Sequence, residues 1–211
     1  MAGSRSKKAI LLGALTVSLA LSGCATEPEA ESAAAPRAQA QEKLVENLRA
    51  GISFEYVPFA TPAEAERDAD VVFAGRVRSI EPALMNNEVG QEGTALLELV
   101  PTNVWKSRAP GRAEAEPVRV LLYRARNAPI EPYREALPEG TQIVVFGYLR
   151  EGIDFDGDIP DGSAYELAPQ SLHLPVGNQL VNVWGADSGG EWPGVDSVAD
   201  FDQALGQSKK P

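Results

Sequence analysis

The stretch 70-DVVFAGRVRSI-80 decides how this chain is expected to fold. Its valines, phenylalanine and isoleucine are residues that favour strands. Gly75 stands in the middle, which favours a bulge or a close approach of another backbone segment where the strand coils. The stretch therefore predicts a long, curved strand that needs partner strands to bury its apolar side chains.

Further segments downstream also have the composition of strands: 94-TALLELVPTNVW-105, 117-PVRVLLYRA-125, 141-TQIVVFGYL-149, 163-SAYELAP-169 and 172-LHLPVGNQLVNVW-184. Pro101 predicts that the first of these is either two half-strands or one strand with a bulge. The run 141–149 is nearly all apolar, which is typical of a central strand. Gly177 and Asn178 predict a hairpin turn in the last segment.

Short helices are expected at both ends of this series of strands. Thr61 as N-cap, Pro62 at the first helical position and Glu64 three residues after the cap predict one of them. Apolar spacing and end signals predict two more: one around Leu44, Val45 and Leu48 that stops at Gly51, and one capped by Ser197 and Asp200 that buries Val198, Phe201 and Leu205 and stops at Gly206.

Five or six short strands between terminal helices indicate a mainly β, mainly antiparallel single domain over residues 42–206. The strand DVVFAGRV after a short helix, followed by a strand that ends near NVWK, resembles secreted bacterial OB-like domains. This resemblance implies a small OB-like or netrin-like antiparallel barrel with short flanking helices. A β-sandwich and an α+β layer fold stay open as alternatives.

The N-terminus has the three-part layout of a secretory signal. Arg5, Lys7 and Lys8 precede an uncharged run over residues 9–20, which is followed by small residues. This run is shorter than the ~20 apolar residues that cross a bilayer core as a permanent helix. It is therefore expected to be a signal and not a membrane span.

The tetrapeptide Leu21-Ser22-Gly23-Cys24 at the end of this signal resembles the lipobox of bacterial lipoproteins. The resemblance implies that Cys24 receives a diacylglyceryl group and that the signal peptide, residues 1–23, is removed before it. The new amino terminus is then often acylated too, and two or more acyl chains hold a protein stably in a membrane. The resemblance thus implies an extracytoplasmic protein, lipid-anchored in the cell membrane or the outer membrane.

Residues 24–41 contain no valine, isoleucine, leucine or aromatic residue, so they are expected to form a disordered tether. Pro28 and Pro36 argue against a helix there, and residues 207–211 are expected to be a disordered tail. Loss of the signal removes three basic residues and moves the formal net charge from −11 to −14. Such a chain is repelled by nucleic acid and by anionic headgroups, and it favours neutral or cationic partners, including metal ions.

The candidate metal ligands are four carboxylates in the segment 153-IDFDGDIPDG-162, namely Asp154, Asp156, Asp158 and Asp161. Hard oxygen ligands between turn-forming glycines suit Ca²⁺. The segment departs from an EF-hand loop, however, because Ile159 stands where that loop needs glycine. The alternative is an acidic, solvated connection between strands. Calcium is the one cofactor that the sequence leaves open.

The remaining candidate for function is a pair of tryptophans, whereas the single histidine is not one. His173 is the single histidine, and without a nucleophile elbow or a second metal ligand it is expected to be a half-buried or surface residue. Trp184 and Trp192 flank the glycine-rich segment 184-WGADSGGEW-192, and tryptophans on loops often form ligand-binding faces. The alternative is that Trp184 ends a strand in the core and Trp192 covers a hydrophobic edge.

These observations predict a lipid-anchored envelope protein that acts as a non-enzymatic binding module for an envelope protein or a small ligand. A carboxylate-dependent hydrolase of envelope or sugar substrates is the alternative, because 30 acidic residues offer many pairs that only a structure can reveal. A calcium-stabilised surface module is a third hypothesis. No nucleic-acid partner is expected.

Overall fold

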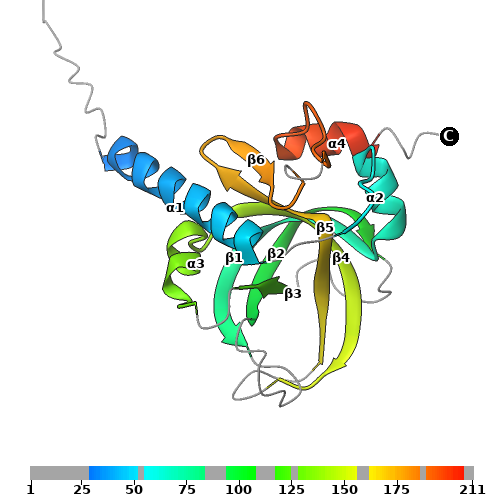
Figure 1. The fold of residues 1–211 in the computed structure, drawn as a ribbon, viewed down its shortest axis with the longest axis horizontal. Helices are drawn as coiled ribbons and strands as arrows, with labels where there is room; N and C mark the ends of the chain where they lie inside the picture. The colour runs from blue at the N-terminus through cyan, green and yellow to red at the C-terminus, as the bar shows by residue number, and fades with distance from the viewer. Residues whose placement is uncertain are drawn as a thin grey trace, which may run out of the picture.

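The computed structural model describes residues 29–51, 55–83, 94–107, 117–124, 128–155, 162–185 and 189–206 (Figure 1). These residues form α1 (Glu29–Gly51), α2 (Pro62–Asp68), β1 (Val71–Ala83), β2 (Thr94–Ser107), β3 (Val118–Tyr123), α3 (Glu131–Ala136), β4 (Gln142–Ile153), β5 (Gly162–Val176), β6 (Gln179–Asn182) and α4 (Val198–Gly206). In these ranges, none of the helices combines the length and the apolar character needed to cross a bilayer.

The six strands form one sheet in the order β3-β2-β1-β4-β5-β6. Neighbours in this order are antiparallel, and β3 also pairs with β5 in parallel at Val120 and Tyr165. This extra pairing joins the two ends of β3-β2-β1-β4-β5 into a closed ring of hydrogen-bonded strands, which β6 extends as a hairpin on β5. The predicted class, mainly β with a closed antiparallel sheet and short flanking helices, is confirmed.

Residues 71–80 of the first quoted stretch belong to β1, which lies between β2 and β4 in the ring. Gly75 faces Pro101 at a register shift between β1 and β2. A Cβ atom at Gly75 would lie 3.0 Å from Phe73 Cε2 and 3.2 Å from the Val100 carbonyl oxygen, so a side chain here would press on both neighbours. The predicted close approach of another backbone segment at Gly75 is confirmed, and the extra residue at the register shift is Thr102 of β2. β2 is one continuous strand with an irregular register at Pro101.

Alternating side chains of β1 enter two different cores, as expected for a strand buried on both faces. Phe73 and Val77 point into the larger core inside the ring, which Leu44 and Leu48 of α1 and Tyr133 of α3 also enter. Val72 and Ala74 point to a second core outside the ring, which α2 and α4 cover side by side (Figure 1). This second core contains Phe146, Trp105, Trp192, Phe201 and Leu205.

The prediction of a disordered tether over residues 24–41 is wrong for residues 29–41, which belong to α1 and are helical. Alanine, glutamate and glutamine are strong helix formers, and they outweigh the backbone hydrogen bond that Pro36 removes. Side chains from 34 to 37 are exposed, and packing begins at Ala40 and Gln41, where Gln41 Nε2 donates to the Ala136 carbonyl over 3.3 Å. Packed structure therefore starts close to the predicted boundary at residue 42. Residues 24–28 and 207–211 lie outside the described residues.

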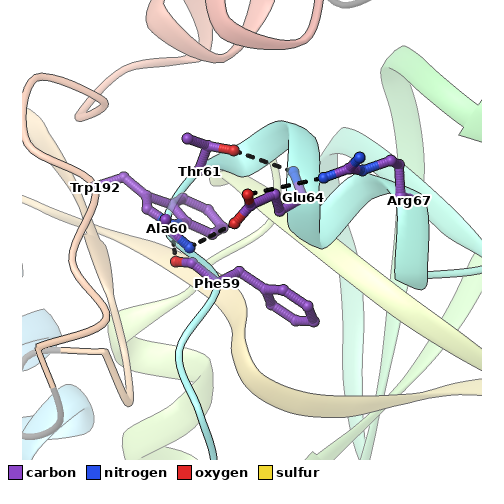
Figure 2. Close-up of polar contacts among 6 residues, drawn as sticks. All are labelled: Phe59, Ala60, Thr61, Glu64, Arg67 and Trp192. Atoms are coloured by element: carbon purple, nitrogen blue, oxygen red, sulfur yellow. Dashed lines mark hydrogen bonds and ion pairs between the residues drawn. The ribbon is translucent and has the colours of Figure 1, made fainter.

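The predicted helix caps at Thr61 and Ser197 are confirmed. Thr61 Oγ1 accepts a hydrogen bond from the Glu64 backbone N–H over 3.2 Å, and the Glu64 carboxylate accepts one from the Ala60 N–H over 2.9 Å (Figure 2). Ser197 Oγ accepts a hydrogen bond from the Asp200 N–H over 3.2 Å. These caps fix α2 and α4, the two helices over the second core.

Candidate functional site

His173 lies inside the protein, with only 2% of its surface exposed, so the prediction of a half-buried or surface residue is wrong. Its neighbours in β5, Leu172 and Leu174, point into the core of the ring, and His173 points to the opposite face. That face is covered: the imidazole stacks on Trp192 with ring centroids 5.3 Å apart and meets the edge of Phe201 at 4.9 Å. The Trp192 segment and α4 remove the histidine from water.

The His173 side chain is neutral in this environment. Burial lowers its pKa from 6.5 to about 3, and the carbonyl of Gln170 opposes this shift only in part. Nε2 lies 3.3 Å from that carbonyl oxygen, which can only accept a hydrogen bond. A neutral imidazole that pairs with a carbonyl carries its proton on Nε2, so Nδ1 holds a lone pair and is an acceptor.

Asn182 of β6 lies directly opposite His173 in the β5–β6 pairing and is 6% exposed. Its Oδ1 accepts hydrogen bonds from the backbone N–H groups of Trp184, over 3.2 Å, and Gly185, over 2.9 Å. These two contacts identify the oxygen, and the remaining amide nitrogen, Nδ2, is a donor. His173 Nδ1 and Asn182 Nδ2 are both buried, and neither has a hydrogen-bond partner in the part of the chain that the structure describes.

His173 and Asn182, here called the polar pair, both line a hollow of about 210 Å³. It lies between the β5–β6 hairpin and the segment 191–196, and we call it the hairpin hollow. Trp192 lines it too and covers the imidazole. Glu191 and Asp196 add two carboxylates to its wall. The hairpin hollow therefore combines a buried donor, a buried acceptor, an indole and an acidic rim.

Gln170 holds the elements around the hollow together. It is 1% exposed and has a φ of 63°, a conformation that costs a residue with a side chain about 1 kcal/mol or more. Its Oε1 accepts from the Phe59 N–H over 2.7 Å, and its Nε2 donates to the carbonyl oxygens of Phe59, over 3.1 Å, and Gly190, over 2.6 Å. The Phe59 carbonyl also accepts from Trp192 Nε1 over 2.9 Å, and these two residues lie side by side in Figure 2.

Glycine is required where the chain folds back beside this site. A Cβ atom at Gly190 would lie 2.7 Å from Tyr56 Oη and 2.9 Å from Gln170 Cδ. A Cβ atom at Gly185 would lie 2.7 Å from Asn182 Cγ. The two glycines are joined by a hydrogen bond from Gly190 N–H to the Gly185 carbonyl, over 2.8 Å. They allow the backbone to reach the amides of Gln170 and Asn182.

The two candidate tryptophans are buried and lie in different cores. Trp184 is 5% exposed within the ring, where its Nε1 donates to the Leu48 carbonyl over 3.3 Å. Trp192 is 7% exposed and belongs to the second core. The structure therefore does not bring them together in an exposed binding face. Trp192 alone lies at the candidate site, beside a histidine that the sequence did not single out as functional.

Of the predicted calcium ligands, the structure describes only Asp154, which is exposed. Asp156, Asp158 and Asp161 lie outside the described residues, as does Cys24 with the rest of the lipobox. Within the described ranges there is no group of three or more side chains suited to a metal ion.

Comparisons of the chain with protein-family models, with curated proteins and with solved structures give no match. What the protein does must therefore be inferred from the chemistry of the site, because a fold alone does not determine function.

Proposed function

We propose that the protein is a lipid-anchored cell-envelope module that binds a small ligand in the hairpin hollow without transforming it. The observation that carries this proposal is the polar pair: a buried acceptor on His173 and a buried donor on Asn182, on directly opposite residues, without partners among the described residues. Leaving a buried polar group unpaired costs about 1–3 kcal/mol. A ligand that pairs with both atoms removes this cost.

The polar pair is held in place before any ligand arrives. Phe201 packs on the imidazole, and the Gln170 carbonyl accepts from its Nε2. Two backbone N–H groups fix the Asn182 side chain through its oxygen. Groups that are already ordered lose little conformational entropy on binding, which favours affinity.

The size and charge of the hollow limit what it accepts. Its volume of about 210 Å³ is below the ~300–1,000 Å³ typical of sites for drug-sized ligands, so it suits a small molecule or one end-group of a larger one. Glu191 and Asp196 line it, and the chain carries a formal net charge of −11. Neutral or cationic ligands are therefore favoured over anions.

Anchoring at Cys24 is supported by the lipobox and is compatible with the shape of α1. The exposed part of this helix extends from the ring in Figure 1. At 1.5 Å per residue, the helix advances ~18 Å between Glu29 and Gln41, where packing begins. A lipid on Cys24 would then hold the domain at a distance from the bilayer, through a helical spacer and not through the disordered tether predicted from composition.

Native mass spectrometry tests the proposal on the lipidated protein, extracted from its own membranes in mild detergent. We expect a non-covalent small-molecule mass on the wild type that is lost when the protein is denatured. Asn182→Asp keeps the oxygen that Trp184 and Gly185 require but removes the amide donor, so the extra mass should be absent. Asn178→Asp introduces the same charge at the exposed hairpin turn and should retain it. A wild-type protein that carries no such mass would contradict the proposal.

A further inference from the structure

The chemistry of the polar pair also restricts the class of ligand. His173 Nδ1 needs a donor and Asn182 Nδ2 needs an acceptor, so one ligand group must offer both. Side chains of directly opposite residues in an antiparallel pair lie on the same face, with Cβ atoms about 4.5–5.5 Å apart. A ligand that pairs with both atoms therefore presents a donor and an acceptor close together, either on one edge of a planar group or on a single hydroxyl oxygen.

Most common ligand groups fail this requirement. Carboxylates at neutral pH only accept, so they cannot pair with Nδ1, and phosphates are disfavoured by the acidic rim. Ammonium and guanidinium groups only donate, so they cannot pair with Nδ2. A trans secondary amide has both functions, but its N–H and C=O point in opposite directions across the planar bond.

We infer that the hairpin hollow recognises a primary carboxamide or a ring amide, in which N–H and C=O lie on the same edge. The inference rests on the proposed function and specifies the ligand of that same site. In the complex the amide N–H donates to His173 Nδ1 and the amide oxygen accepts from Asn182 Nδ2. The group is planar and uncharged, which suits a site beside the Trp192 indole and behind an acidic rim.

Entry of the amide requires Trp192 to shift, because this indole covers the imidazole and both polar atoms are buried. The indole is held by one hydrogen bond to the Phe59 carbonyl. Gly194 follows two residues later with a φ of +76° and with open space around it. The Val195 N–H donates to the Trp192 carbonyl over 3.1 Å and holds this turn, so the shift that entry requires is one of the indole side chain. The fluorine signal of a labelled Trp192 should therefore report on binding.

The test uses the full lipidated chain in detergent micelles, labelled with 5-fluorotryptophan, which gives one fluorine signal for each of its 3 tryptophans. Trp192→Phe assigns the signal of interest, and Trp105 and Trp184 serve as internal controls. The probes are acetamide as the primary amide, 2-pyrrolidone as the ring amide, N-methylacetamide as the trans amide and 2-propanol as a hydroxyl compound of similar size. A comparison of acetamide with 2-pyrrolidone distinguishes a primary carboxamide from a ring amide as the recognised group.

We expect acetamide or 2-pyrrolidone to shift the Trp192 signal with half-saturation in the millimolar range, as suits ligands of so few atoms. N-methylacetamide and 2-propanol should bind at least ~10-fold more weakly, and Asn182→Asp should abolish the response that Asn178→Asp keeps. Equal responses to all probes, or a response to 2-propanol alone, would overturn the inference while leaving the proposed function intact. No response to acetamide and 2-pyrrolidone also overturns it. If the proposed function itself is wrong, native mass spectrometry shows this separately, because the extracted protein then carries no small-molecule ligand.

Discussion

The side chain of Gln170 and the backbone of Phe59 form two hydrogen bonds with each other, from the Phe59 N–H to Oε1 over 2.7 Å and from Nε2 to the Phe59 carbonyl over 3.1 Å. We expect Gln170→Ala to lower the free energy of unfolding by about 2–4 kcal/mol, because it removes three hydrogen bonds and takes the side-chain amide away from the Phe59 N–H and the buried Gly190 carbonyl. Urea unfolding measures this loss. Gln179→Ala, which removes one exposed hydrogen bond to Asp196, is the control and should cost about 0.5 kcal/mol or less.

The backbone conformation of Gln170 gives a second comparison at the same position. Glycine adopts a φ of 63° without a steric penalty, whereas alanine does not. Gln170→Gly should therefore be more stable than Gln170→Ala by about 1 kcal/mol, although both lack the amide. Equal stabilities would show that the φ of residue 170 relaxes when its side chain is lost.

Gly147 should not tolerate a side chain. A Cβ atom there would lie 2.8 Å from Tyr165 Cβ and 2.9 Å from Val71 Cγ1, between two neighbouring strands. We expect Gly147→Ala to lower the free energy of unfolding by about 1–3 kcal/mol through overpacking. Gly206→Ala, in open space at the end of α4, should change stability by about 0.5 kcal/mol or less. A tolerated alanine at 147 would contradict the packing between β1, β4 and β5.

Stability should depend on pH through His173. The folded protein protonates this residue only near pH 3, whereas the unfolded chain does so near 6.5. Between these values the unfolded state binds more protons, so the free energy of unfolding falls as pH falls, by up to about 1.4 kcal/mol per pH unit. Above the unfolded pKa the contribution is constant.

His173→Phe isolates this effect from that of the carboxylates. The difference in unfolding free energy between wild type and variant should be flat above pH 7 and should shift in favour of the variant from about pH 6 down to pH 4. Chemical denaturation at a series of pH values measures it. Parallel profiles for the two proteins would mean that His173 is not buried as a neutral group.

Lipidation predicts the fate of the Cys24→Ser precursor. Without the thiol no diacylglyceryl group can be attached, so the variant should lose metabolic labelling with a fatty acid and stay unprocessed. Labelling followed by gel analysis of membrane and soluble fractions checks this. A variant that is still labelled would rule out Cys24 as the anchor.

Structural features that depend on a few neighbouring residues could be predicted from the sequence. Gly75 marked the close approach of β2 to β1, Thr61 and Pro62 marked the start of α2, and Gly177 with Asn178 marked the hairpin. The parallel pairing of Val120 with Tyr165, which closes the ring, joins residues far apart in the chain, and no local pattern announces it. The helix over residues 29–41 could not be predicted from apolar spacing, because this segment has no large apolar residue and Pro28 and Pro36 argue against a helix.

The candidate site was harder to predict for a related reason. The alternation of Leu172, His173 and Leu174 indicates that the histidine faces away from the leucines, and this much is visible in the sequence. That α4 and Trp192 cover that second face depends on tertiary packing. Likewise, the pairing of His173 with Asn182 follows from the hairpin register, but only the structure shows that His173 Nδ1 and Asn182 Nδ2 have no partner among the described residues.

A high-resolution crystal structure of the protein extracted from its own membranes would show whether the polar pair holds an amide. The decisive observation is the electron density between His173 Nδ1 and Asn182 Nδ2. We predict a multi-atom ligand that donates to the first atom and accepts from the second, with Trp192 displaced from the imidazole. A single water molecule that bridges the two atoms, with Trp192 still stacked on His173, would satisfy both groups without a ligand and would contradict the account.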